Sequence, residues 1–473
     1  MFAADQSATS NISFALVDRG GLSLVSSGTA QTTSVGYASI QPDSGRTAPS
    51  GLAIFGLRQN NVLVSETGVP AAALIQSGRI YAEAGGPVNT GLAMANPNSQ
   101  VATVTFFFTD ANGVNFATGS TTIPAKGQLA AFLDKAPFNG GSSINGSFTF
   151  NSSVPISVIA LRGLANERSE FLMTTLPVTD LSTTTGVGSL VFPHFAEGGG
   201  WRTQIVLVNP TDIVLTGSVQ FRDQLGQASS LAVNGQTNNS FAYSIPARSS
   251  QKLQTSGTGA TILSGYVRVT PAANTPAPSG SAIFSFRSDG KTVAEAGVPA
   301  SPSAGAFRMY AEASGDFSRG APGSIQSGLA IVNNSGNVAA VTLELNKLDG
   351  SSTGLTGTLQ VPANGQAVMF INQIQGFAAL QTPFQGVLRI SSPASIAVVG
   401  VRGRYNERNE FLFTTIPSAN EAAAAPALFI PHLADGGGYS TQFIIFSGTA
   451  GQTSTGILQL FTQSGGTLNL KMQ

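Results

Sequence analysis

The chain has 473 residues, of which 42% are hydrophobic and only 10% are charged, and its 23 basic and 23 acidic residues give a formal net charge of zero. Without a basic stripe, nucleic acid is disfavoured as a partner. Cysteine is absent, which excludes disulfides, thiolate metal sites and cysteine nucleophiles. No apolar run reaches the ~18–20 residues that cross a bilayer, so we expect no membrane insertion.

The same composition suggests where the protein works. A surface poor in charge and rich in Thr, Ser, Asn and Gly is typical of secreted β-proteins, so we expect an extracellular or cell-surface protein. The start "MFAADQSATS" lacks the basic and apolar regions of a signal peptide. The alternatives are a mature exported product, which we favour, and a cytoplasmic chain. Low charge also does little to keep copies apart, which favours self-association.

In chain order, the first segment, 1–75, matches only the second half of a longer repeat. Its stretch "SFALVDRGGLSLVSSG" aligns with "SFAYSIPARSSQKLQTSG" from Ser240 onward. Apolar residues alternate with period two at Ile12, Phe14 and Leu16, and again at Leu22 and Leu24. This alternation predicts strands with one buried face.

Three whole units follow, at 79–180, 190–302 and 308–420, with short joints between them. Each is built from runs of five to eight residues rich in Val, Ile, Phe and Thr, separated by Gly, Asn, Asp or Pro. Such short strands at regular spacing indicate an antiparallel β-sandwich. Because the joints are short, we expect a rod with limited flexing.

The units repeat in two subtypes. "YAEAGG" at Tyr81 and "YAEASG" at Tyr310 open one subtype, and "HFAEGGG" at His194 and "HLADGGG" at His432 open the other. The long period is about 230–240 residues. The last segment, 428–473, matches only the first half of the His subtype. The predicted fold class is all-β, with tandem Ig-like antiparallel sandwiches of which three are complete and are flanked by two complementary halves.

The two half units are complementary because Gln473 aligns with about residue 234 and Met1 with about residue 230. Left unpartnered, each half would expose an apolar face and free strand edges. We therefore predict an assembly interface that joins the two halves, made by Ile12, Phe14, Leu16, Leu22, Leu24, Leu458, Leu460, Leu468, Leu470 and Met472.

Three arrangements satisfy this complementarity. The C-terminal half of one copy joins the N-terminal half of the next, which gives a head-to-tail filament; or one chain closes on itself; or the chain is a fragment of a longer repeat protein. We favour the filament over self-closure, because a semi-rigid row of three sandwiches has distant ends. The expected partner is therefore the protein itself.

This pattern of tandem sandwiches without cysteine resembles bacterial immunoglobulin-like surface repeats. The split unit resembles the logic of donor-strand-complemented pili, in which one subunit completes the fold of the next. The resemblance implies an exported, self-assembling, pilus-like surface filament. It carries over no functional residue, and we expect no enzyme activity, cofactor or metal.

Four Arg–Glu pairs recur with a spacing of eight residues, and their recurrence is notable in a chain so poor in charge. Each pair falls near one predicted hairpin, so we expect structural ion pairs that set strand register rather than an acid paired with an electrophile. The pairs are Arg58 and Glu66, Arg162 and Glu170, Arg287 and Glu295, and Arg402 and Glu410.

The remaining candidates point to packing or turns. His194 and His432 share one repeat position with the two Tyr residues, which favours a structural role over metal ligation. "DGKT" at Asp289 lacks the upstream Gly of a phosphate loop, and "DAN" at Asp110 is a turn with too few acidic residues for calcium. Trp201 and Tyr439 each follow a "GGG" run. If exposed, they would bind surface glycans, so the alternative function is an adhesin or glycan-binding stalk.

Overall fold

The computed structural model describes residues 8–183, 186–423 and 428–473, and over these ranges the chain is antiparallel β-structure with two single-turn 3₁₀ helices. This confirms the all-β prediction. No helix in the described part of the chain is long and apolar enough to cross a membrane. Parts of the joints at 178–189 and 418–427 lie outside the described residues.

The first unit spans 74–180. Its strand β12 is long enough to serve two layers: its first half pairs with β7 and β9, and its second half with β8 and β13. The strands are β7 (Leu74–Gly85), β8 (Val88–Ala95), β9 (Ala102–Asp110), β10 (Asn115–Ile123), β11 (Gln128–Phe132), β12 (Ile144–Ala165), β13 (Phe171–Leu176) and β14 (Thr179–Asp180).

The second unit spans 190–299 and separates the same layers into two four-stranded sheets, β15-β22-β17-β20 and β21-β16-β23-β24. Its strands are β15 (Leu190–Glu197), β16 (Trp201–Val208), β17 (Leu215–Asp223), β18 (Leu231–Val233), β19 (Gln236–Asn238), β20 (Ser240–Ile245), β21 (Ser250–Gln254), β22 (Leu263–Pro271), β23 (Ser279–Ser288) and β24 (Lys291–Pro299).

The third unit, 303–420, repeats the topology of the first, with β30 as its long shared strand. Its elements are β25 (Ser303–Ser314), η1 (Phe317–Arg319), β26 (Ile325–Asn333), β27 (Ala339–Lys347), β28 (Ser352–Val361), β29 (Gln366–Phe370), η2 (Ile371–Gln373), β30 (Phe384–Tyr405), β31 (Phe411–Ile416) and β32 (Ala419–Asn420).

A fourth unit, here called the closing unit, is assembled from both ends of the chain. Its sheets β2-β35-β4-β33 and β3-β34-β5-β6 repeat the two sheets of the second unit strand for strand. The strands are β1 (Ala8–Thr9), β2 (Asn11–Leu16), β3 (Gly21–Val25), β4 (Ser34–Pro42), β5 (Ser50–Gln59), β6 (Val62–Pro70), β33 (Leu428–Asp435), β34 (Tyr439–Phe446), β35 (Ser454–Thr462) and β36 (Leu470–Lys471).

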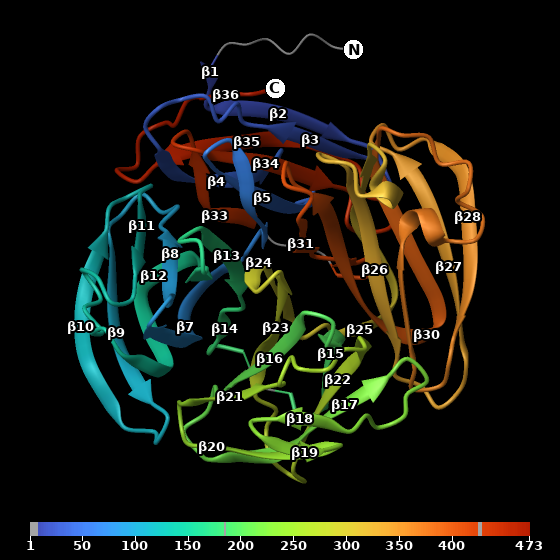
Figure 1. The fold of residues 1–473 in the computed structure, drawn as a ribbon. Coiled ribbons are helices and arrows are strands. Elements are labelled where there is room, and N and C mark those ends of the chain that lie inside the picture. The colour runs from blue at the N-terminus through green and yellow to red at the C-terminus, as the bar shows by residue number, and fades with distance from the viewer. Residues whose placement is uncertain (1–7, 184–185, 424–427) are drawn as a thin grey trace.

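The four units form a ring rather than a rod, with β1 and β36, from opposite ends of the described chain, side by side at the rim (Figure 1). The expectation of a rod with distant ends is therefore wrong. Neighbouring units pack side by side through polar contacts that tie each unit to the backbone of the next. Arg79 donates to the Asn209 carbonyl at 2.7 Å, and Arg308 donates to the Ser447 carbonyl at 3.2 Å.

Self-closure follows from this bending. Residues of β2 and β3 pair with β35 and β34 of the same chain, so that Ile12 lies opposite Leu458 and Leu22 opposite Ile445. The sequence favours completion by another copy, but here the two halves complete each other within one chain. The physical reason is the turn at every joint, which brings the ends together.

Candidate functional site

One strand of each unit lies at the centre of the ring. These inner strands, β6, β13, β24 and β31, contact one another in a closed cycle. Side chains of one strand bond the backbone of the next: Thr175 Oγ1 donates to the Gly68 carbonyl at 2.7 Å, and Thr415 Oγ1 donates to the Gly297 carbonyl at 2.8 Å. The cycle joins all four units at one place.

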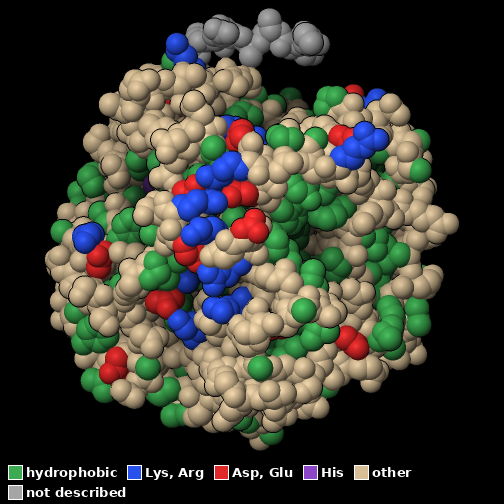
Figure 2. Space-filling view, viewed as in Figure 1, with side chains coloured by type: hydrophobic (Ala, Val, Ile, Leu, Met, Phe, Trp, Pro, Cys, Tyr) green, Lys and Arg blue, Asp and Glu red, His purple; other side chains and the backbone are tan. Residues whose placement is uncertain are grey.

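A band of charged side chains runs over this centre, and Figure 2 shows it as closely spaced blue and red atoms, with only scattered charged side chains elsewhere on this face. We call it the hub. It consists of ion pairs between and within units, made by Arg58, Glu66, Glu83, Arg162, Glu167, Arg168, Glu170, Lys252, Arg287, Glu295, Glu312, Arg402, Arg404, Glu407, Arg408 and Glu410.

Two loops with the same local structure form the more exposed part of the hub. In the first, Asn166 Oδ1 accepts from the backbone N–H groups of Arg168 and Glu170, each at 2.9 Å, and so closes an Asx turn. The second repeats this turn around Asn406. Each turn places an Arg and a Glu side by side. In the first loop, Ser169 has a positive φ of 61°.

The two loops form two ion pairs with each other across the centre of the ring. Arg168 Nη1 lies 2.7 Å from Glu410 Oε1, and Arg408 Nη1 lies 2.6 Å from Glu170 Oε1. Burial alone would raise the pKa of the Glu170 carboxyl, but hydrogen bonds from Arg408, Asn166 and Arg168 outweigh it and lower that pKa. The result is a reciprocal clamp between the first and third units.

Each loop also binds a hairpin of a further unit. Glu167 accepts from the Thr292 N–H at 2.7 Å and pairs with Arg287 at 3.0 Å. Glu407 accepts from the Leu63 N–H at 2.8 Å and pairs with Arg58 at 2.7 Å. The loops thereby fasten the second and closing units as well.

Below the loops lie two almost fully buried ion pairs, Arg162 with Glu295 and Arg402 with Glu66. Their side chains are 2–6% exposed. Burial would raise the pKa of the Glu66 carboxyl, but Arg402 and Arg404 offset this and lower it. The Glu66 carboxylate therefore remains charged against its guanidinium partners across a unit boundary.

These contacts correct the predicted ion pairs. All eight predicted residues do form ion pairs, but none does so with the residue eight positions away within the described chain. Arg58, for example, lies at the exposed end of its hairpin opposite Leu63, whereas Glu66 is buried further along β6. The eight-residue spacing reflects repeated inter-unit contacts and not strand register inside one hairpin.

The histidines occupy equivalent places between units. Gln128 Nε2 lies 3.1 Å from His432 Nδ1 and also donates to the Pro431 carbonyl at 2.7 Å. Gln366 Nε2 lies 3.4 Å from His194 Nδ1 in the same arrangement. Burial lowers the pKa of both histidines to about 4, so both are neutral at pH 7. No cluster of potential metal ligands occurs among the described residues.

The predicted interface residues all fall in the closing unit. Phe14, Leu16, Leu458, Leu460, Leu468, Leu470 and Met472 are buried in one core, against which Ile12 and Leu22 pack, and Leu24 lies opposite Phe443. The short pair β1–β36 takes the place that the hairpin β18–β19 has in the second unit. The structure thus brings the predicted residues together within one chain.

The two predicted glycan-binding aromatics are packed rather than fully exposed. The Trp201 ring centroid lies 4.7 Å from Phe286 and 4.9 Å from Phe413. Tyr439 packs against the core of the closing unit. At the proposed turn "DAN", Asp110 Oδ1 accepts from the N–H groups of Asn112 and Val114, at 2.9 and 2.8 Å, which commits that carboxylate to the turn.

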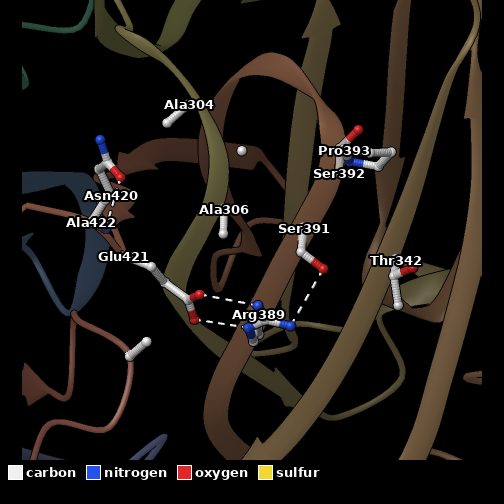
Figure 3. Close-up of a pocket in the computed structure, with 12 residues that line it drawn as sticks. Ala304, Ala306, Thr342, Arg389, Ser391, Ser392, Pro393, Asn420, Glu421 and Ala422 are labelled. Carbon is white, nitrogen blue, oxygen red and sulfur yellow. Dashed lines mark hydrogen bonds and ion pairs between the residues drawn. The ribbon is translucent and has the colours of Figure 1, made fainter.

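A cavity of about 690 Å³ lies beside the third unit, bounded by Ala304, Ser391 and Asn420 (Figure 3). The cationic side chain in its lining, Arg389, is bound by Glu421 at 2.8 Å and by Glu344 at 2.6 Å. With both carboxylates in place, the guanidinium is already neutralised, and the cavity has no free cation to offer an anionic ligand.

Sequence reasoning missed the loop residues Glu167, Arg168, Glu407 and Arg408. They stand in the most closely repeated segments, "LRGLANERSEFLMTTLP" and "VRGRYNERNEFLFTTIP". Charged residues kept in a repeat of a charge-poor chain were the available signal.

No family model and no curated protein matches the chain. Among solved structures, the crystal structure of Thermotoga maritima 1070 is 14% identical, with a TM-score of 0.20 over 22% of this chain and 92% of that one. A structure of infectious bursal disease virus, Gt strain, is 11% identical with a TM-score of 0.11, covering 86% and 82%. A glycoside hydrolase family 32 structure from Bifidobacterium adolescentis is 9% identical with a TM-score of 0.14, covering 68% and 98%. These scores carry no argument about this chain.

Proposed function

We propose that this chain is a non-catalytic structural protein of the cell surface or extracellular space, and that its working form is the closed ring. The observation that carries the proposal is the closing unit, in which residues 11–70 and 428–462 build two sheets together. A chain that completes its own split sandwich leaves no half-built apolar core exposed. The ring is then a compact module locked at its centre and at its rim.

The hub supports a structural role over a catalytic one. Catalytic acids and bases need a pKa near the working pH and access to a substrate. The hub carboxylates have the opposite property, since guanidinium partners hold the pKa values of Glu66, Glu170 and Glu410 below the usual range. Their charges are used to bind one unit to another.

A head-to-tail filament is the second candidate, and one observation favours it. Every strand pair between residues 11–25 and 439–462 would form equally well if the two segments came from different copies. Exchange of identical elements between copies is a low-cost route to assembly. The filament would then use the predicted interface residues, but only after the closing unit had opened.

A glycan-binding stalk has weaker support. Trp201, on which that alternative depends, packs against Phe286 and Phe413, so much of its ring is in contact with side chains of the protein. Loops at the rim of the ring remain available for recognition, and a surface glycan stays a candidate partner there.

The proposal is tested by measuring mass and shape together. Light scattering after gel filtration, over a wide range of protein concentration, should give the monomer mass throughout, and negative-stain images should show compact rings. Filaments from the intact chain would favour the second candidate. Extended rods of monomer mass would overturn the closed ring.

Two substitutions on one strand provide the matched comparison. Leu458 is fully buried in the closing unit, whereas its neighbour Ile457 is 36% exposed on the other face of β35. Leu458→Asp should open the ring, produce larger species and lower the midpoint of unfolding. Ile457→Asp should leave mass and shape unchanged. A variant lacking residues 1–28, and with them β1 to β3, should behave like Leu458→Asp.

A further inference from the structure

A second cavity, of about 410 Å³, lies between the closing unit and the first unit and is partly open to solvent. Strands β8, β11, β12 and β13 supply one wall, and β4, β33 and β34 supply the other. We call it the interface cavity. Its wall includes Ala130, Phe132, Phe171, Met173, His432 and Tyr439.

The lining is apolar and uncharged. The described side chains around the interface cavity include no Asp, Glu, Lys or Arg. Phe132 and Phe171 meet edge to face with ring centroids 6.1 Å apart. The polar groups available are few, chiefly the Tyr439 hydroxyl, the His432 ring and the Gln463 amide. A charged or heavily hydroxylated ligand would lose its hydration without replacement.

The duplication of the chain provides an internal comparison for this cavity. The second unit packs on the third as the closing unit packs on the first: Gln366 donates to the Gly265 carbonyl at 2.9 Å, as Gln128 does to the Gly36 carbonyl at 2.9 Å. At this second interface, Trp201 stands in the place of Tyr439. We call it the sister site.

In the sister site the protein's own aromatic rings occupy the corresponding space. The Trp201 indole lies 4.9 Å from Phe413 and 4.7 Å from Phe286, and Phe411 is 6.5 Å away, all between centroids. At the interface cavity, smaller residues replace three of these: Tyr439 for Trp201, Met173 for Phe413, and Leu57 for Phe286. Two of the smaller residues, Tyr439 and Met173, line the interface cavity. The cavity therefore lies beside positions that carry larger aromatic rings in the sister site.

We propose that the interface cavity binds a neutral, planar aromatic molecule of one or two rings. The sister site shows which chemistry fits this fold at this position, because an indole between phenyl rings fills it. Offset and edge-to-face contacts with Phe132, Phe171 and Tyr439 would hold such a ligand. Mostly apolar walls with a few polar groups are typical of small-molecule sites.

This inference does not rest on the proposed function. The cavity needs a completed closing unit, whether one chain or two chains complete it. An open ring would show an altered mass, whereas a failure of ligand binding would leave the mass unchanged, so the two proposals fail in distinguishable ways.

The test uses the intact chain and prodan, a neutral naphthalene probe with two fused rings whose fluorescence changes in apolar surroundings. We expect saturable binding with one probe per chain, and displacement by indole. Absence of saturable binding, or binding that indole does not displace, would overturn the proposal.

Variants that copy the sister site locate the binding. The double variant Tyr439→Trp, Met173→Phe should fold, as judged by circular dichroism and thermal unfolding, and should bind the probe at least tenfold more weakly. The reciprocal variant Trp201→Tyr, Phe413→Met opens the sister site and should bind a second probe. Undiminished binding by the first, folded variant would overturn the assignment, whether or not the reciprocal variant folds.

Discussion

At the scale of single residues, the buried ion pairs of the hub hold charges that only a neighbouring unit neutralises. Glu66, on β6 of the closing unit, contacts Arg402 and also Arg404, at 2.8 Å, of the third unit. Removing one partner of a buried pair leaves an uncompensated charge in a poorly solvated place. The hub is therefore sensitive to single changes although its pairs contribute little net stability.

Glu66→Gln should destabilise the chain by about 3–5 kcal/mol, because Arg402 would stay buried without the closer of its two counter-ions and only Glu312 would remain. Urea unfolding gives the value. Asp316→Asn is the control: its partner Arg319 is 85% exposed, and an exposed pair of this kind is worth about 0–1 kcal/mol. Equal losses in the two variants would mean that the hub does not hold the units together.

The two histidines give a pH dependence whose sign follows from their pKa values. Burial lowers the pKa to about 4 in the folded chain, against about 6.5 when unfolded. Below pH 6.5 the unfolded chain therefore binds more protons, and stability falls as the pH drops towards 4. The hub residues Glu66, Glu170 and Glu410, whose folded pKa values are also lowered, add a further loss below about pH 4.5.

The double variant His194→Gln, His432→Gln should flatten this curve between pH 6.5 and 4.5. A protonated ring would place an N–H group against the Nε2 donor of Gln128 or Gln366, and a glutamine side chain cannot acquire that proton. The measurement is the urea midpoint of unfolding at several pH values. What is compared between parent and variant is how steeply this midpoint changes with pH, and not its absolute value. The same slope in parent and variant would exclude the histidines as the cause.

At the scale of elements, the inner strands approach so closely that two glycines are required. A Cβ atom on Gly68 would stand 2.1 Å from the Thr415 carbonyl oxygen, and one on Gly297 would stand 2.2 Å from that of Thr175. Such contacts are far inside van der Waals distance, and here the obstacle is backbone that cannot rotate away. The cycle of inner strands therefore tolerates no side chain at these positions.

Gly68→Ala should lower the free energy of unfolding by roughly 1–3 kcal/mol or more, as overpacking of a filled interior does. Thermal unfolding and gel filtration would show the change, the latter because β6 must move away from β31. Gly336→Ala is the matched control, because nothing lies within 4 Å of a Cβ atom there. A Gly68→Ala protein as stable as the control would contradict the close approach.

The strands themselves were predictable, whereas their partners across units were not. Period-two alternation at Ile12, Phe14 and Leu16 correctly predicted a half-buried strand, β2. The pairing of Arg402 with Glu66 was beyond reach, because it depends on inner strands of four units meeting at one axis. Repeats identify which residues recur, but the angle between units decides which of them touch.

At the scale of the whole molecule, the ends of the chain fall inside a hairpin. The pair Ala8–Lys471 in β1–β36 corresponds to Thr237 and Ala232 in the continuous hairpin β18–β19. The sequence predicted this complementarity, but completion within a chain and between chains uses the same contacts. What favours completion within one chain is the bend at each joint, because it brings both half units to one point of the rim.

A circular permutant tests whether the position of the break controls assembly. It would join Gln473 to Ala8 through a short glycine-containing turn and begin at Ser301, in the joint between β24 and β25. The closing unit would then be continuous, with no half unit to exchange. We expect the permutant to stay monomeric after refolding at high concentration, whereas the parent chain should form exchanged dimers and larger species, separated by gel filtration with light scattering. Only the parent has half units that can pair either within one chain or between two chains. Equal amounts of dimer in both proteins would therefore show that exchange does not involve the closing unit.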